Sequence, residues 1–134
     1  MTLTHERLAE AVTCMRCEPE RFNHERRILP RFRIWAPLTV TPMLQTARGA
    51  EPSQPFTVWV RDLSRGGIGL MHTEPLSGGF EFLVPLPRLD GEPETLVAQV
   101  VYCAAAAPQM FSVGAQFTGR SPLQVVGVEA VGAR

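Results

Sequence analysis

Residues 56–72 read FTVWVRDLSRGGIGLMH, a stretch that indicates two β-strands joined by a short loop. Its two ends, residues 56–61 and 67–72, are rich in the apolar and β-branched residues typical of strands. The loop between them carries an aspartate, a serine and two glycines. A carboxylate can accept hydrogen bonds from the edge of guanine, a hydroxyl can donate to a phosphate oxygen, and glycine lets the backbone approach a ligand closely. The loop therefore holds the parts that a guanine-nucleotide site needs.

Further strands are expected on both sides of this hairpin, over residues 34–44, 80–86, 95–103 and 110–117. The first of them contains two prolines, which are typical of an edge strand or a bulge. Residues 45–55 are rich in turn formers and predict an exposed hairpin loop, and residues 87–94 predict another turn. Residues 104–108, four alanines and a proline, are expected to join the last two strands. Short strands with no helices between them predict an antiparallel barrel or sandwich.

The residues before the strands predict one short amphipathic helix over residues 4–15. Leu8, Ala11, Val12 and Met15 recur at helical spacing, and Thr4 can cap the first turn. A helix of this length is marginal alone in water, so its apolar side should pack on the barrel or on a second subunit. The chain divides accordingly into a helix and loop (1–24), a barrel domain with its arm (25–120) and a tail (121–134) whose structure the sequence leaves undecided.

Composition limits the classes of protein that this chain can belong to. Its 134 residues suit one folded domain. Thirteen basic and thirteen acidic residues give no net charge, which argues against a general duplex-DNA binder. No apolar stretch is long enough to span a bilayer and no signal pattern opens the chain, so a cytoplasmic protein is expected, without membrane insertion.

Cysteine and histidine chemistry gives weak signals. Cys14 and Cys17 form a Cys-x-x-Cys with His5 and His24 nearby, but no second such pair occurs and the chain lacks a thioredoxin-like pattern. Ordinary reduced thiols are favoured, with no metal site and no cofactor. No nucleophile has an obvious base and no Walker-type loop occurs, so no catalytic residue is expected and the chain is not interpreted as an enzyme.

The most unusual feature is an arginine cluster at residues 25–33, ERRILPRFR. Pro30 would break a helix and biases its predecessor toward extended geometry. The segment is therefore expected to be an extended arm. All thirteen basic residues are arginines, whose planar forks grip phosphate or a guanine edge with two hydrogen bonds.

Two motifs in this order resemble a known family. Arg27-x-x-x-Arg31 followed by Asp62-x-Ser64-x-x-Gly67 is similar to the paired signature of PilZ domains, bacterial receptors for cyclic di-GMP. Residues 113–117, VGAQF, also resemble the glycine-containing strand that closes the family's barrel. The resemblance covers residues 26–117 and implies a mainly β protein, with a six-stranded antiparallel PilZ-like barrel, a short N-terminal helix and an arginine-bearing arm.

The resemblance also implies the roles of the signature residues. Arg27 and Arg31 would hold guanine edges and phosphates, Asp62 and Ser64 would reach guanine and neighbouring polar atoms, and Gly67 would permit close approach. The ligand would be cyclic di-GMP. An arginine immediately before the signature, here Arg26, goes in the family with an intercalated pair of ligand molecules, which implies two molecules per chain.

The function implied is a receptor or adaptor that changes conformation on binding cyclic di-GMP and signals to a partner protein. The sequence names neither that partner nor the process controlled, and it leaves a homodimer open. One alternative is a PilZ-fold module that makes protein contacts without binding nucleotide. A weaker one is a small nucleic-acid-binding barrel, for which only Phe32 and Trp35 interleave aromatic with basic residues.

Several residues have simpler interpretations. Asp62 and Ser64 are good turn formers, because their side chains bond their own backbone. Arg61 and Arg65 can be exposed turn charges, and Arg33 a solvated strand residue. His72 and Cys103 lie in expected strands and are interpreted as core or surface filler.

Overall fold

A computed structural model describes residues 1–15 and 31–121 of the chain. It contains one helix and seven strands, in the order α1 (His5–Met15), β1 (Phe32–Thr46), β2 (Gly49–Pro52), β3 (Phe56–Leu63), β4 (Gly67–His72), β5 (Glu81–Leu86), β6 (Glu94–Ala107) and β7 (Met110–Phe117). The expected mainly β class is confirmed. In the described part, no helix is long and apolar enough to cross a membrane.

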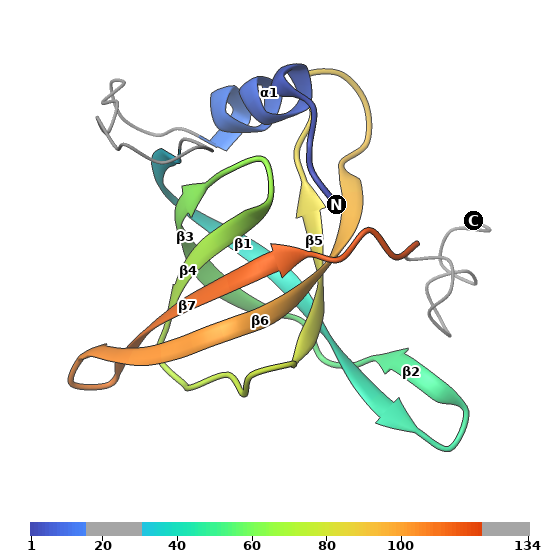
Figure 1. Ribbon diagram of the computed structural model, residues 1–134, viewed down its shortest axis with the longest axis vertical. Coiled ribbons are helices and arrows are strands. Elements are labelled where there is room, and N and C mark those ends of the chain that lie inside the picture. The colour runs from blue at the N-terminus through green and yellow to red at the C-terminus, as the bar shows by residue number, and fades with distance from the viewer. Residues whose placement is uncertain (16–30, 122–134) are drawn as a thin grey trace.

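Six of the strands close into an antiparallel barrel (Figure 1). Their order is β1-β3-β4-β7-β6-β5, and β5 pairs back onto β1 at residues 41–43. β2 pairs only with the end of β1, and together they form a hairpin that projects from the barrel. Closure gives each barrel strand a neighbour on both sides and so protects its backbone groups. The predicted six-stranded antiparallel barrel is therefore confirmed.

Side chains that alternate along a strand help to fill the barrel, as β3 shows. Along β3, Val58 and Val60 are buried while Thr57 and Trp59 between them are exposed. The largest fully buried side chains come from all six barrel strands and include Phe82, Leu63, Leu70, Val40, Val100 and Val113. Each such side chain stabilises the fold by about 1.5–3 kcal/mol relative to leaving it in water.

The helix α1 covers one end of the barrel and belongs to the same core (Figure 1). Its buried residues Leu8, Ala11, Val12 and Met15 are those expected from the periodicity. Thr4 caps it as predicted, since its Oγ1 accepts the backbone N–H of Arg7 at 3.1 Å. The apolar side of the helix therefore finds its partner in its own chain.

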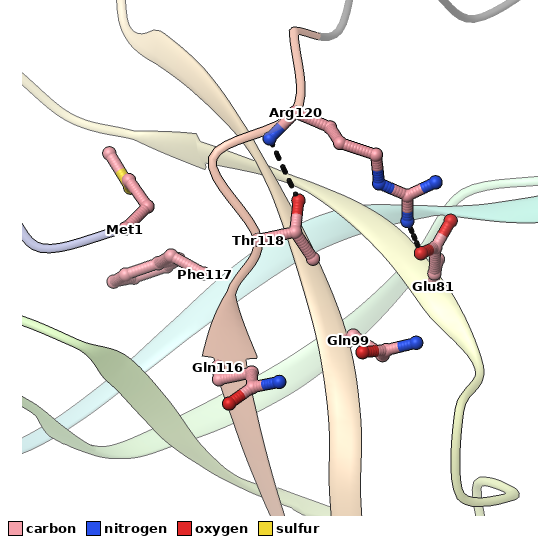
Figure 2. Close-up of a pocket in the computed structure, with 7 residues that line it drawn as sticks. All are labelled: Met1, Glu81, Gln99, Gln116, Phe117, Thr118 and Arg120. Carbon is pink, nitrogen blue, oxygen red and sulfur yellow. Dashed lines mark hydrogen bonds and ion pairs between the residues drawn. The ribbon is translucent and has the colours of Figure 1, made fainter.

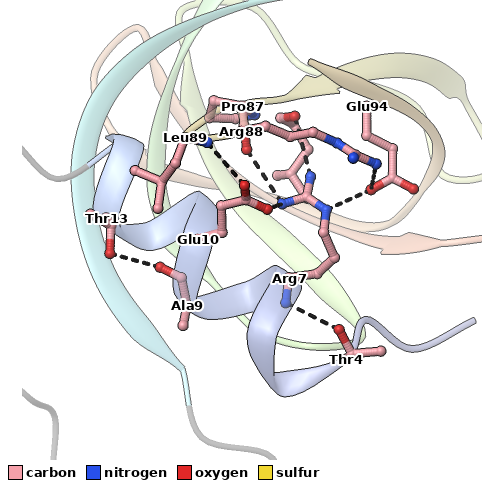
Figure 3. A network of polar contacts seen from close by, with 10 residues as sticks. Thr4, Arg7, Ala9, Glu10, Thr13, Pro87, Arg88, Leu89 and Glu94 are labelled. Atoms are coloured by element: carbon pink, nitrogen blue, oxygen red, sulfur yellow. Dashed lines mark hydrogen bonds and ion pairs between the residues drawn. The ribbon is translucent and has the colours of Figure 1, made fainter. Parts of the chain in front are cut away.

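Arg7 fastens this helix to the barrel (Figure 3). Its guanidinium donates to Glu94 Oε1 at 2.7 Å and to Glu10 Oε1 at 2.9 Å. It also donates to the carbonyls of Leu86 and Pro87, at 3.3 and 3.4 Å. Arg7 thus ties one helical turn to the connection between β5 and β6.

Some sequence expectations were wrong in detail. The alanines 104–107 belong to strand β6 and pair with β7, so only Pro108 and Gln109 form the turn, with Gln109 at a φ of 59°. Alanine has low strand propensity, which explains the error. Residues 45–55 are not one loop, because β1 runs to Thr46 and β2 follows. Strand β1 has the expected bulge, a register shift between Arg33 and Ala36, but of the two prolines only Pro37 lies next to it, while Pro42 pairs with Phe82 of β5.

Candidate functional site

The signature loop is shorter than the sequence indicated. Asp62 lies within β3, so the loop proper is Ser64, Arg65 and Gly66, and Gly67 opens β4. A register shift between Val60 and Asp62 accompanies this extension of the strand. Ser64 donates its N–H to the Gly67 carbonyl at 3.0 Å, and its Oγ lies 3.4 Å from the same oxygen. Ser64 therefore stabilises the turn itself, as its simpler interpretation proposed.

Asp62 faces two arginines. Its Oδ2 accepts from Arg61 Nε at 2.8 Å, and its Oδ1 lies 3.6 Å from Arg31 Nη1. The Asp62 side chain is only 14% exposed, whereas that of Arg31 is 34% exposed. One carboxylate thus faces two guanidinium groups, which leaves an excess positive charge where an anion can approach.

Arg61 is not the exposed turn charge expected. It lies on β3, and beyond Asp62 it donates to the hydroxyls of Ser112 and, at 3.1 Å, Tyr102. Burial alone would lower the pKa of Arg61, but the hydrogen bonds to Tyr102 and Asp62 outweigh burial and raise it. The same hydrogen bond from Arg61 lowers the pKa of the Tyr102 hydroxyl against the opposing effect of burial. The network therefore keeps a permanent cation beside a polarised phenol.

One cross-strand row explains why these side chains meet. Arg33 pairs with Asp62, Asp62 with Gly69, Gly69 with Gly114 and Gly114 with Tyr102, across β1, β3, β4, β7 and β6. The two glycines at its centre have no side chains, so Asp62 and Tyr102 can lean inward from both sides.

Side chains lie over Gly69 and Gly114, the two glycines that we call the glycine floor. A Cβ at Gly69 would lie 2.5 Å from Arg61 Nη2 and 2.6 Å from Asp62 Oδ1, and one at Gly114 would overlap the ring of Tyr102. A Cβ at Gly67 would overlap the backbone carbonyl of Ala115. Any larger residue at these positions would displace a member of the site or the backbone beneath it.

A cavity of about 160 Å³ opens beside this network, next to Gly67 and Gly114. Its lining includes four of the six predicted site residues, Arg31, Asp62, Ser64 and Gly67, together with Tyr102, Gly114 and Gln116. The other two, Arg26 and Arg27, lie outside the described residues, as does Cys17. The structure thus brings together residues that are 31 positions apart in sequence.

Sequence reasoning missed Arg61 as a network member, Tyr102 and Ser112. Gly69 and Gly114 gave a usable signal, because a glycine inside a strand often marks the close approach of another group. Tyr102 and Ser112 gave none, since their position depends on the β6–β7 pairing. Arg33 is exposed, as expected.

The turn is also attached to the start of the chain. Leu3 donates its N–H to the Arg65 carbonyl at 2.7 Å, and Arg65 Nε donates to the Leu3 carbonyl at 2.7 Å. Arg65 Nη1 lies 3.3 Å from His5 Nε2. Arg65 is therefore a link between the turn and the N-terminal segment and not a free surface charge.

A second hollow, of about 460 Å³, is lined by residues that include Glu81, Gln99, Gln116 and Arg120 (Figure 2). Gln116 lines both cavities. It belongs to the next cross-strand row, in which Glu81 pairs with Gln99, Gln99 with Gln116 and Gln116 with Gly67. Arg120 closes one side through an ion pair with Glu81. The outer face of β5, β6 and β7 thus carries a polar row that ends at the signature turn.

The remaining predicted residues have structural surroundings. His72 contacts the Phe56 ring at 4.8 Å between centroids, and burial lowers its pKa. Cys103 accepts the backbone N–H of Leu76 at 3.4 Å, and Cys14 is an exposed free thiol. Within residues 1–15 and 31–121, no three His, Cys, Asp or Glu side chains gather as a metal site would require.

Neither a family model nor a curated protein matches the chain. Among solved structures, it is similar to MrkH of K. pneumonia in complex with c-di-GMP, with a TM-score of 0.49 and 20% identity, covering 81% of this chain and 51% of that one. The PilZ domain of YcgR from Escherichia coli with c-di-GMP gives 0.45 and 19%, covering 73% and 82%. Apo MrkH gives 0.42 and 15%, covering 88% and 50%. The chain spans about half the length of MrkH.

Proposed function

We propose that this chain is a receptor for cyclic di-GMP that acts in the cytoplasm without catalysing a reaction. The observation that carries the proposal is the cavity in which Arg31, Asp62, Ser64 and Gly67 meet. These are the described members of the paired signature, and they surround a glycine floor with an excess of positive charge. A cyclic dinucleotide complements this surface, because its two phosphates carry negative charge and its bases are flat.

The long ion pair between Arg31 and Asp62 suggests how the ligand would enter. Arg31 and Asp62 are 3.6 Å apart, longer than the 2.8 Å contact of Asp62 with Arg61. A phosphate can draw Arg31 away at little cost, because a partly exposed ion pair contributes only about 0–1 kcal/mol. Asp62 Oδ1 would then be free to accept from the N1 and N2 edge of guanine, while Arg61 keeps the carboxylate in place.

The signal would follow from the position of Arg31. It directly precedes β1 and is the last arginine of the Arg-x-x-x-Arg motif, so its move toward a phosphate carries the end of the arm with it. Arg26 and Arg27 would complete the site from that arm, with Arg26 favouring an intercalated pair of ligand molecules. The rearranged arm would present a new surface to an output protein.

One observation favours the alternative function, an interaction module without a nucleotide. Ser64 is bonded within its own turn and Asp62 already has two arginine partners. A site whose polar groups satisfy one another can be purely structural. Binding measurements separate the two functions directly.

The test is isothermal titration of cyclic di-GMP into the purified chain and matched variants. We expect saturable binding with close to two ligands per chain, lost in Arg27→Ala and weakened at least tenfold in Arg31→Ala. Arg48→Ala is the control, because Arg48 pairs with Glu51 on the projecting β1–β2 hairpin and its side chain is 73% exposed. A flat titration of folded protein would establish the alternative instead, and one ligand per chain would refute the role given to Arg26.

A further inference from the structure

Two tryptophans lie stacked on the outer surface of the barrel. The ring centroids of Trp35 and Trp59 are 5.3 Å apart and their planes differ by 15°. Trp35 is 49% exposed and Trp59 is 41% exposed. Two large indoles left together in water are unusual, because such side chains are mostly buried. The exposed surface of the two indoles is therefore a candidate binding surface.

Strand alternation fixes their direction. Ile34 and Ala36 point into the barrel on either side of Trp35, and Val58 and Val60 do so on either side of Trp59. Trp59 pairs with Pro37, and Trp35 lies in the register shift between Arg33 and Ala36, so the two indoles stack across neighbouring strands without being a register pair. Because each ring limits the rotamers of the other, the flat surface is formed before any ligand arrives.

Arginines flank this pair on the same face. Arg33 lies two residues before Trp35, and Arg61 lies two residues after Trp59, which places each about 7 Å along its strand. Arg33 is exposed, and no ion pair joins it to any residue in the described ranges 1–15 and 31–121. Arg33 also pairs in register with Asp62, and Arg61 donates to Asp62. The tryptophan pair therefore lies next to the candidate site.

We propose that the Trp35–Trp59 stack is a base-stacking subsite that extends the cyclic dinucleotide site onto the outer face of β1 and β3. A purine of the ligand would lie on the free face of an indole, and Arg33 would meet a phosphate. Interleaved aromatic and basic side chains are the surface on which bases stack and phosphates bind. The proposal rests on the proposed function, and it enlarges that site beyond the paired signature.

The surroundings favour a nucleotide over an apolar protein segment. Beyond the tryptophans, the exposed face continues with Thr39 and Thr57, whose hydroxyls lie 3.3 Å apart in a hydrogen bond. The apolar area thus consists of the two indoles and the neighbouring Pro37, with cations at one end and hydroxyls at the other. This suits one planar base with an attached phosphate.

Intrinsic fluorescence tests the proposal, because Trp35 and Trp59 are the two tryptophans of the chain. We expect cyclic di-GMP to quench their emission saturably, with the same midpoint as the heat of binding. Trp59→Leu and Trp35→Leu should each weaken binding roughly 5- to 150-fold, the effect of losing one base stack. Trp59→Phe should retain more affinity than Trp59→Leu. Thr39→Ala, on the same face but farther from Arg33, should bind as the unchanged chain does.

The outcomes separate this proposal from the receptor itself. Saturable calorimetric binding with no change in emission, and with leucine variants of unchanged affinity and unchanged melting, would overturn the stacking subsite and leave the receptor standing. A flat titration of the unchanged chain would overturn both. Quenching by a single-stranded oligothymidylate but not by cyclic di-GMP would overturn the proposal in favour of a nucleic-acid surface.

Discussion

Arg7 and Arg61 each stand at the centre of a polar network, but the two networks close differently. Arg7 is 16% exposed, and carboxylates and carbonyls of its own chain take its donors, as Figure 3 shows. Its neighbour Arg88 contacts Glu94 at 3.7 Å, so two cations, Arg7 and Arg88, balance the two carboxylates Glu10 and Glu94. Arg61 is 30% exposed and shares its one carboxylate with a second arginine.

This difference distinguishes a structural network, around Arg7, from a candidate binding network, around Arg61. A network with balanced charge, in which four of the five guanidinium donors are bonded within the chain, has little left to offer a ligand, so its contribution is to stability. A network with surplus positive charge, hydroxyl partners and a cavity above it can exchange partners when an anion arrives. We therefore expect the removal of Arg7 to reduce stability and the removal of Arg61 to reduce binding.

The largest effect is expected for Arg7→Met. The change removes the charge-assisted hydrogen bonds to Glu10 and Glu94 while keeping much of the aliphatic packing. We expect the free energy of unfolding to fall by about 2–3 kcal/mol, as measured by urea denaturation. Affinity for cyclic di-GMP should be unchanged under conditions where the variant is folded. Arg88→Ala is the control, since its 3.7 Å contact and 42% exposure predict a loss below about 0.5 kcal/mol. A weakened affinity in Arg7→Met would erase the distinction between the networks.

Arg61→Met should reverse this pattern. Asp62 keeps Arg31 as a partner, so stability should fall by only about 1 kcal/mol. Cyclic di-GMP should bind about 10- to 100-fold more weakly in calorimetry, because the cation that orients Asp62 and Tyr102 is gone. If stability fell as far as in Arg7→Met while affinity stayed unchanged, the role of Arg61 would be structural, like that of Arg7.

The smallest effect concerns Tyr102, the one tyrosine of the chain. Its hydrogen bond from Arg61 lowers its pKa, so tyrosinate absorbance should appear below the ordinary value of about 10. The midpoint should rise in Arg61→Met, and the urea-denatured chain gives the reference. The pKa of Tyr102 is lower in the folded chain than in the unfolded chain. Its ionisation therefore begins to add stability as pH rises through the folded pKa, and the full contribution is present above the unfolded pKa. At neutral pH it contributes nothing. An unshifted midpoint in the folded chain would show that Arg61 leaves the phenol unpolarised in solution.

Much of the fold was predictable because its signals are local. The strands Gly67–His72 and Met110–Phe117 were predicted with the bounds observed, since turn residues flank each of them. The helix and its cap at Thr4 were predicted from local signals as well. The expected meeting of Arg31 with Asp62, Ser64 and Gly67 is seen in the described cavity, but their ligand remains a prediction.

The rest depends on pairings that no short stretch encodes. Asp62 was placed in a loop because aspartate is a turn former, and the bulge that extends β3 through it gives no sequence signal. Arg61, Ser112 and Tyr102 meet only because β3, β4, β7 and β6 align in register, with Gly69 and Gly114 between them. The stacked tryptophans likewise follow from the β1–β3 register.

The two-way contact between Leu3 and Arg65 has a practical consequence for protein engineering. It joins the first residues of the chain to the signature turn across 62 positions of sequence. A fluorescent protein fused ahead of Met1 would therefore be anchored a few residues from the turn, on the side of the barrel covered by α1. Such a fusion would make a compact reporter of rearrangements at the turn.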